Sequence, residues 1–381
     1  MTNEKWISSP RIQQRVSEPS YIQRGICKLS TNQRSNATVT PMGDYYLHTD
    51  NTITLGRRHH KKLRDELSAK FKKTGEMKVD FNLTELKSKY NFRLRPLDEG
   101  LDHIQDYIIE KSKENKTTNL NKLLHGAQIV CSRRTLKVLG SSPYVPWGWS
   151  FAIEKYHDIF FLKELGQTEH KCILNDNTCF GFIFEELIFS SNGKPPPIGG
   201  TISTFEKMYV ATLTRLSHIN TKDKGINVFA TASIDGLDGD GKYIEAKTSS
   251  LDNNQPKITL EWWLQSKFAS IETIIQGIKI TEDNTTKIKD IRKVNLVDLN
   301  LICNKWEGNI CCGAIHQIFA AIISNYDDFI NDIKSKRQME DQPRIILMKT
   351  GKQSPNIMFE EDRRPFPILK PEFKNRFPET K

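Results

Sequence analysis

Residues 227–250 place the tightest constraint on what this chain can fold into. They read NVFATASIDGLDGDGKYIEAKTSS. The first part, VFATASID, is rich in strand-forming residues and predicts a strand that ends at Asp235, and KYIEAKTS predicts a second strand. Because LDGDG between them supplies turn residues, the whole stretch predicts a β-hairpin.

Acidic and basic side chains gather on one face of the second strand. Side chains alternate along a strand, so Glu245 and Lys247 share a face while Ala246 points to the other. Asp235 lies near that face if the hairpin pairs in register. Two carboxylates beside a lysine suit a divalent-metal nuclease, because the acids can hold Mg²⁺ or Mn²⁺ while the ammonium orients a water molecule and offsets charge on the phosphate. The D…(D/E)-x-K spacing is typical of PD-(D/E)xK nucleases, but solvated hairpins carry it too, so the motif alone leaves both interpretations open.

The composition indicates a globular protein with a basic surface. The chain of 381 residues can bury a large core in one or two domains, and its net charge of +10 favours a polyanionic partner, although many proteins with such a charge bind none. The seven cysteines are scattered without a C-x-x-C pair, which indicates free thiols rather than disulfides or a zinc site. No apolar run predicts a signal peptide or a membrane span. We therefore expect a cytosolic or nuclear protein that is not secreted.

Periodicity predicts both helices and strands behind a polar N-terminal arm, residues 1–45, in which no regular pattern is visible. Apolar spacing predicts helices in three segments, residues 96–113, 204–216 and 306–333. Short apolar runs predict strands within residues 127–139, 151–165 and 343–373. Residues 258–280 read as a helix that enters a strand near Ile274.

The segment 57–73, RRHHKKLRDELSAKFKK, is strongly basic and predicts a partial helix. Its charges are typical of a solvated face. The alternative is a patch that contacts phosphate groups, with Arg57 and Arg58 as the candidates.

Three features elsewhere bear on a site or a core. An apolar run contains the adjacent acids Glu185 and Glu186, and an acid that points inward requires a partner such as a metal ion or an arginine. The pair Trp262 and Trp263 indicates core packing, with base stacking as the alternative. His316 lies in the third predicted helix, which favours an ordinary helix residue over a ligand.

Four segments, taken in chain order, resemble the DXO family of eukaryotic RNA 5′-end decapping enzymes and 5′-to-3′ exoribonucleases. They are IVCSRRTLKVLGSSPY with Arg133, GFIFEE with Glu185, SIDG followed by YIEAKTS, and EWWLQS with Gln265. The resemblance runs from the predicted helix near Leu101 to the PFPIL segment near the end. The linked motifs are far more specific than any one of them.

The resemblance implies a mixed α/β (α+β) fold in a single domain over residues 46–381, with two curved mixed β-sheets flanked by helices and a PD-(D/E)xK nuclease-like active site. Members of this family remove incomplete or atypical RNA caps, including 5′ triphosphates, unmethylated guanosine caps and NAD, and can degrade monophosphorylated RNA. We therefore expect hydrolysis at RNA 5′ ends by a monomer that uses Mg²⁺ or Mn²⁺ and has no membrane partner.

The resemblance also implies residue roles. The metal-binding residues are Glu185, Asp235 and Glu245, with the backbone carbonyl of Ala246 as a further ligand. Lys247 joins the three acids as a catalytic residue and contacts the substrate. The other substrate-binding candidates are Arg133, Gln265 and, as an outer contact, Glu99, together with Arg134, Ser233 and the basic pair Arg57 and Arg58.

Two positions depart from the family pattern. Ser233 stands where relatives carry the first acid of a Glu-x-Asp motif, and a neutral hydroxyl is a poorer Mg²⁺ ligand than a carboxylate. Arg134 stands where relatives tend to have glycine, which adds bulk and charge beside Arg133. Glu186 compensates for the missing acid only if a backbone irregularity turns it inward.

Three hypotheses follow from this pattern. The first is an active but altered decapping nuclease. The second is a pseudoenzyme that binds RNA 5′ ends without cleavage, with Ser233 as its main support. The third, a structural protein that uses the fold as an interaction surface, is less favoured because the remaining site residues would then serve no purpose.

Overall fold

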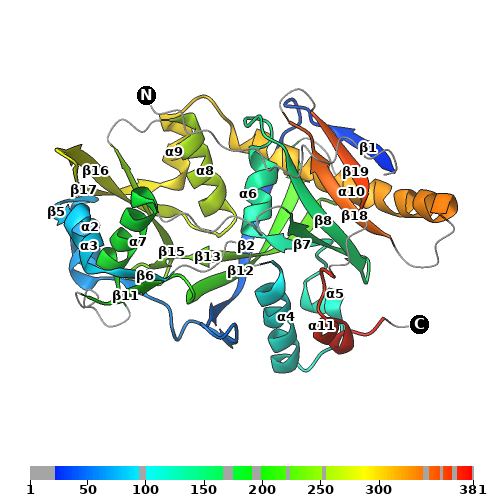
Figure 1. Cartoon of the computed structure of the whole chain (residues 1–381), viewed down its shortest axis with the longest axis horizontal. Coiled ribbons are helices and arrows are strands. Elements are labelled where there is room, and N and C mark those ends of the chain that lie inside the picture. Colours follow the sequence, from blue (N-terminus) through cyan, green and yellow to red (C-terminus); the bar gives the residue numbers. More distant parts are fainter. Residues whose placement is uncertain are drawn as a thin grey trace.

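The computed structural model describes residues 22–93, 100–165, 175–190, 199–219, 224–250, 255–337, 343–351, 355–362 and 367–379, without the side chains of residues 300–302. Two mixed β-sheets with helices packed around them make up these residues (Figure 1). The predicted mixed α/β class with two sheets is therefore confirmed.

The larger sheet has ten strands in the described part of the chain. From edge to edge they are β1 (Gln23–Lys28), β19 (Asn356–Asp362), β18 (Arg344–Lys349), β8 (Trp149–Tyr156), β9 (Ile159–Glu164), β7 (Ile129–Ser132), β13 (Ile226–Ile234), β12 (Lys207–His218), β2 (Ser35–Leu47) and β3 (Ile53–Leu55). The central strand β7 runs parallel to both β9 and β13, whereas the outer pairs are antiparallel. This sheet is therefore mixed.

The smaller sheet has seven strands among the described residues. They are β10 (Phe189–Ser190), β4 (Lys62–Leu63), β14 (Gly236–Leu237), β15 (Tyr243–Ser250), β16 (Thr273–Glu282), β17 (Thr285–Asn295) and β5 (Glu76–Asn82). The pair β15 and β16 is parallel and the pair β16 and β17 is antiparallel. A separate parallel pair is formed by β6 (Asn91–Arg93) and β11 (Thr201–Ser203).

Helices cover both sheets. The described helices are α2 (Asp65–Thr74), α3 (Leu83–Lys89), α4 (Asp102–Glu114), α5 (Leu120–Leu123), α6 (Arg133–Ser141), α7 (Asp176–Ile188), α8 (Pro256–Lys267), α9 (Leu296–Ile302), α10 (Gly308–Arg337) and α11 (Pro371–Arg376). In Figure 1 the smaller sheet, with α2, α3 and α7, forms the left end, and α4, α5 and α11 lie below the right part. None of these helices is long and apolar enough to cross a membrane.

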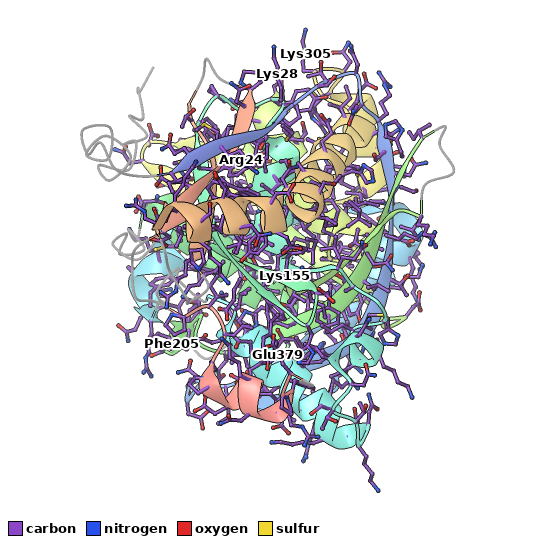
Figure 2. All side chains as sticks on the ribbon, turned by 90° about the vertical axis from the view of Figure 1, so that its right-hand side faces the viewer. Arg24, Lys28, Lys155, Phe205, Lys305 and Glu379 are labelled. Atoms are coloured by element: carbon purple, nitrogen blue, oxygen red, sulfur yellow. The ribbon has the colours of Figure 1, made fainter. Side chains whose placement is uncertain are left out.

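The long helix α10 ties several strands together. Arg24 of β1 and Lys155 of β8 lie on either side of it in Figure 2. Arg24 is 3.7 Å from the carboxylate of Asp332, and Lys155 donates a hydrogen bond of 2.7 Å to Asp327. The two aspartates belong to α10, so the helix connects two strands that are not neighbours in the sheet.

The prediction that residues 227–250 form a hairpin of two directly paired strands is wrong. Its two strands form, as β13 and β15, but they belong to different sheets. The chain changes sheets at Asp235, and the short strand β14 that follows pairs with β15 around the predicted turn. A Cβ at Gly236 would lie 2.4 Å from the ring of Phe189, so the change of sheet passes through a position where only glycine fits.

The helix predicted at residues 204–216 is also wrong, because this segment forms strand β12. The strand lies between β2 and β13 in the interior of the larger sheet, and five consecutive residues, 208–212, are buried. A strand that is buried on both faces shows no alternation, so its apolar residues resemble a helical pattern.

The N-terminal arm predicted to be irregular contains strands β1 and β2 in its described part, residues 22–45, so the prediction is wrong there. Residues 1–21 lie outside the description. The segment between the two strands is held by α10, because Gln317 donates to the carbonyl of Ser30 (2.9 Å) and accepts from its amide (3.0 Å). These partners are distant in sequence, so local periodicity does not reveal them.

Most other elements are confirmed. The helices predicted at residues 96–113 and 306–333 form as α4 and α10 in the described part of the chain. The predicted strands appear as β7, the pair β8 and β9, and the pair β18 and β19, and the segment 57–73 is helical from Asp65 onward. Trp263 and His316 are buried, and the six cysteines within the described residues form no disulfide with one another.

Candidate active site

Strand β15 presents Glu245 and Lys247 on one face. Ile244 and Ala246 pack in an apolar cluster with Phe184 of α7, so the alternating residues project to the opposite face. Glu245 is only 2% exposed, and the ammonium of Lys247 donates a hydrogen bond of 2.6 Å to its Oε1. The prediction that these two residues share a face is confirmed.

Asp235 reaches β15 from the point where the chain changes sheets. Its Oδ2 accepts a hydrogen bond of 2.8 Å from the backbone N–H of Ala246. This bond places the aspartate beside Glu245, although β13 and β15 are not paired. The prediction that Asp235 lies near Glu245 is confirmed, but the predicted cause, pairing of the two strands in a hairpin, is wrong.

Arg133 connects three parts of the site. It is the first residue of α6, whose first turn is capped by the Ser132 side chain at the end of β7. Its guanidinium donates to the hydroxyl of Ser233 (3.1 Å) and to the backbone carbonyl of Gln265 (3.4 Å). A third contact, 3.6 Å long, joins Nη1 to Oε2 of Glu245. The structure therefore brings Arg133, with Ser233 and the backbone of Gln265, to Glu245 of β15.

The three acids have different proton affinities. Burial raises the pKa of Glu185 well above its ordinary value, and the negative charge of Asp235 raises it further. Burial and the charge of Glu245 raise the pKa of Asp235 to about 6. Burial alone would raise the pKa of Glu245, but Lys247 and Arg133 outweigh it and the pKa falls. The negative charges of Glu185 and Asp235 are therefore not fully offset by nearby cations, whereas the charge of Glu245 is offset by Lys247 and Arg133.

The donor set fits a divalent cation in its chemistry. Glu185, Asp235 and Glu245 repel one another, and the buried Oε2 of Glu245, 3.6 Å from Arg133, accepts no hydrogen bond from the part of the chain that the structure describes. A cation held between hard oxygen ligands would relieve both conditions. Within the described residues, however, no group of three His, Cys, Asp or Glu side chains is already gathered as a metal site. Lys247 and Arg133 supply the positive charge at Glu245, and Ser233 contributes a hydroxyl where a fourth carboxylate would be expected.

Arg134 and Glu186, the sequence neighbours of Arg133 and Glu185, point away from the site. Arg134 donates a hydrogen bond of 2.6 Å to Glu164 at the end of β9. Glu186 forms an ion pair with Lys61, and α7 continues without interruption past this position. Glu186 therefore does not replace the missing acid, and Arg134 is not brought to the acids as a substrate contact.

The basic pair also lies apart from the acids. Arg57 donates to Oδ2 of Asp44 (2.7 Å) and to the hydroxyl of Tyr243 (2.6 Å), so it serves a structural ion pair. Arg58 is exposed. Glu99 lies outside the described residues.

Sequence reasoning missed Lys137 and the acid Asp44. Lys137 lies four residues after Arg133 on α6, a spacing that places both on one helix face. The signal was the capping sequence SRRT, which marks a helix start that the prediction of a strand obscured. Nothing in the sequence reveals that Asp44 contacts Tyr243, because the two residues are on different sheets.

An Asp at the end of one strand, a Glu-x-Lys on another and a helix-borne Glu, three acids against the two cations Lys247 and Arg133, define the class of PD-(D/E)XK-type nuclease folds. The chain belongs to the family described as RAI1 like PD-(D/E)XK nuclease, whose model matches residues 40–374.

Comparison with individual proteins agrees with this family. The chain is 24% identical over 267 residues to the decapping nuclease dom-3 of Caenorhabditis elegans, a match that covers 66% of this chain and 65% of the worm protein. The fold is similar to Rai1 of Scheffersomyces stipitis, solved with (3'-NADP)+ and calcium (TM-score 0.65, 14% identity, 94% of this chain and 98% of that chain). Rai1 of Candida albicans, solved with pU5 and Mn²⁺, is similar as well (TM-score 0.63, 13% identity, 94% and 99%).

Proposed function

We propose that this protein is a divalent-metal-dependent hydrolase that acts on RNA 5′ ends. Its substrates would be RNAs with incomplete or atypical caps, such as a 5′ triphosphate, an unmethylated guanosine cap or NAD, and it would also degrade monophosphorylated RNA from the 5′ end. The observation that carries the proposal is that Asp235, bound to the amide of Ala246, lies beside Glu245 and Lys247 of strand β15, within the electrostatic influence of Glu185. The family and the worm decapping nuclease support it.

The neighbouring structures support the choice of cofactor and substrate. The Rai1 proteins were solved with calcium or Mn²⁺ and with nucleotides or pU5. In this chain Glu185, Asp235, Glu245 and the carbonyl of Ala246 would hold Mg²⁺ or Mn²⁺. A bound ion of this kind lowers the pKa of water and neutralises charge on the phosphate.

The cationic residues of the site have separate roles in the proposal. Lys247 is held toward Glu245, and from there its ammonium can orient the attacking water. The guanidinium of Arg133 lies between Ser233 and Glu245, and its N–H groups can bind non-bridging phosphate oxygens as charge develops on them. The product would be RNA with a 5′ monophosphate.

A pseudoenzyme that binds RNA 5′ ends without cleaving them is the second candidate. Ser233 favours it, because the hydroxyl is already bound to Arg133 and offers no charge to a metal ion. One carboxylate fewer weakens metal affinity and raises the concentration of divalent ion that catalysis requires.

Cleavage assays separate the two candidates. Purified protein is incubated in Mg²⁺ or Mn²⁺ with triphosphorylated, guanosine-capped and NAD-capped RNAs, beside Asp235→Ala, Ser233→Glu and the control Glu186→Gln. Cleavage by the wild type and by Glu186→Gln, but not by Asp235→Ala, supports the hydrolase. Cleavage that begins only in Ser233→Glu supports the pseudoenzyme, and RNA binding that is unaffected by Arg133→Ala and Lys247→Ala contradicts both.

A further inference from the structure

Helices α6 and α8 are neighbours (Figure 1), and α8 is contacted near both of its ends, by α6 at one end and by the loop after α6 at the other. At one end, Arg133 donates to the carbonyl of Gln265 near the end of α8. At the other end, the indole ring of Trp147, in the loop after α6, lies 5.1 Å from the ammonium of Lys257 in the first turn of α8. Eight residues separate Lys257 from Gln265, which corresponds to about 12 Å along the helix.

The side of α8 that joins these two points is accessible. Lys257, Glu261 and Gln265 repeat every four residues and therefore lie along one stripe of the helix. Lys257 is exposed and the other two are half-buried, whereas Leu260 and Leu264 on the inner side are buried in the core. The stripe therefore forms a continuous surface that begins at the proposed active site.

Lys137 lies on α6 one turn after Arg133, within electrostatic reach of Glu261 on the stripe. Burial lowers its pKa, and the positive charges of Arg134, Arg133 and Lys247 lower it further, although Glu261 acts in the opposite direction. Within the described residues, Lys137 has no hydrogen bond or ion pair. A half-buried ammonium with three cations and one acid, Glu261, near it is stabilised by a bound anion, and a phosphate group meets that requirement.

Trp147 lies at the far end of the surface. It is 44% exposed, which is unusual for a tryptophan in a chain whose other large aromatic side chains are mostly buried. An exposed indole beside a lysine is the combination that stacks a nucleobase while attracting the neighbouring phosphate.

We propose that the surface between α6 and α8 binds the single-stranded RNA that follows the 5′ nucleotide, with Lys137 on a backbone phosphate and Trp147 stacked on a base. The inference rests on the proposed function for the position of the 5′ end. Two observations favour RNA as the occupant. The surface adjoins the site at Arg133, and beyond the Arg133–Glu245 pair its positive charge comes from Lys137 and Lys257, with the acid Glu261 near Lys137.

The test measures binding rather than cleavage, in full-length protein with Ca²⁺. Fluorescence anisotropy gives the affinity for a labelled ten-nucleotide 5′-monophosphorylated RNA, and competition gives the affinities for a dinucleotide and for the cap analogue guanosine(5′)triphospho(5′)adenosine. The variants are Trp147→Ala, Trp147→Phe and Lys137→Gln. Lys122→Gln, an exposed lysine on α5, is the control for loss of one charge.

We expect Trp147→Ala to weaken binding of the ten-nucleotide RNA about tenfold and Trp147→Phe to restore most of it, since stacking needs only an aromatic face. Lys137→Gln should weaken binding about threefold and reduce the slope of log K against log salt by about 0.7, the contribution of one phosphate contact on a single strand. Binding of the dinucleotide should not change, and Lys122→Gln should match the wild type.

Equal affinities of all variants for the ten-nucleotide RNA would overturn the proposal, and so would a loss confined to the cap analogue, which would place the cap rather than the RNA on this surface. If the wild type cleaves RNA but these variants bind normally, the binding surface is wrong and the proposed hydrolase stands. If the variants weaken binding but the wild type never cleaves, the surface stands and the hydrolase is wrong.

Discussion

Strand β15 contributes to two polar clusters, and they differ in how the charges of their carboxylates are balanced. The Tyr243 cluster consists of Tyr243, Asp44 and Arg57. Oδ1 of Asp44 accepts from the hydroxyl of Tyr243 and Oδ2 accepts from Arg57, each at 2.7 Å. Burial on its own would raise the pKa of Asp44, but the imidazole of His60, 3.5 Å away, and hydrogen bonds from Arg57 and Tyr243 lower it. This cluster joins the two sheets and leaves its carboxylate fully paired.

The acid site, defined as Glu185, Asp235, Glu245 and Lys247, lies two residues farther along the same strand. There the pKa values of Glu185 and Asp235 are raised, and no described residue donates a hydrogen bond to Oε2 of Glu245. Buried acids that repel one another reduce the free energy of unfolding, so their presence is explained by chemistry rather than by folding. The Tyr243 cluster shows that this chain can satisfy a buried carboxylate on the same strand.

The largest effect is expected for Glu185→Gln. The substitution keeps the shape of the side chain but removes a metal-binding charge, so cleavage of 5′-triphosphorylated RNA in Mn²⁺ should fall about 100-fold or more. The free energy of unfolding should not decrease, because the substitution removes the repulsion between Glu185 and the neighbouring acids. Single-turnover kinetics and urea denaturation measure the two quantities.

Glu186→Gln is the matched control, since it changes the adjacent acid that is paired with Lys61. Its cleavage rate should stay within a few fold of the wild type. Equal loss of activity in Glu185→Gln and Glu186→Gln would contradict the assignment of Glu185, and not Glu186, to the acid site.

The opposite result is expected in the Tyr243 cluster. Asp44→Asn replaces a paired, largely buried carboxylate and should lower the free energy of unfolding by about 2 kcal/mol, because the donors of Arg57 and Tyr243 lose their charged partner. Asp235→Asn should raise the free energy of unfolding at pH 7.5. Urea denaturation in EDTA compares the two variants, and the same sign for both would remove the distinction between the clusters.

The two aspartates should also give opposite pH dependence. The pKa of Asp235 is raised to about 6, so the folded state holds its proton between about pH 4 and 6 and the free energy of unfolding falls as the pH rises through that range. The pKa of Asp44 is lowered, so its contribution is present above the ordinary pKa of an aspartate and is lost as the pH falls. The stability difference between Asp235→Asn and the wild type should therefore grow from pH 4 to pH 7, measured without metal. A constant difference would contradict the raised pKa.

The smallest effects concern the basic pair. Arg57→Ala breaks the ion pair with Asp44 and removes the contact with the Tyr243 ring, so it should cost about 1 kcal/mol of unfolding free energy. Arg58→Ala changes an exposed side chain and should stay within about 0.5 kcal/mol of the wild type. Equal losses in thermal or urea unfolding would show that Arg58 has a structural role as well.

Local pattern was sufficient for much of the fold. The composition of β13 and β15 and the apolar spacing of α4 and α10 identify these elements without knowledge of their partners. Strand β12 was misread because both of its faces are buried, and β1 and β2 were missed because their partners are far away in sequence. Long-range pairing decides these segments, and a single sequence does not show it.

The site was predictable as a set of residues but not as a geometry. The spacing of Asp235, Glu245 and Lys247, together with the family resemblance, identified the acids. The bond from the amide of Ala246 that places Asp235 depends on a change of sheet that no local motif marks. The pairing of Glu186 with Lys61 is likewise a tertiary contact.

Thermal unfolding with and without Mn²⁺ tests most directly whether the acid site exists to hold a cation. A ligand that binds only the folded state raises the melting temperature, and it does so only where its site is intact. We expect Mn²⁺ to raise the melting temperature of the wild type, Glu186→Gln and Asp44→Asn, and to have little effect on Glu185→Gln and Asp235→Asn. An equal rise in all five proteins, or no rise in the wild type at millimolar Mn²⁺, would contradict the account.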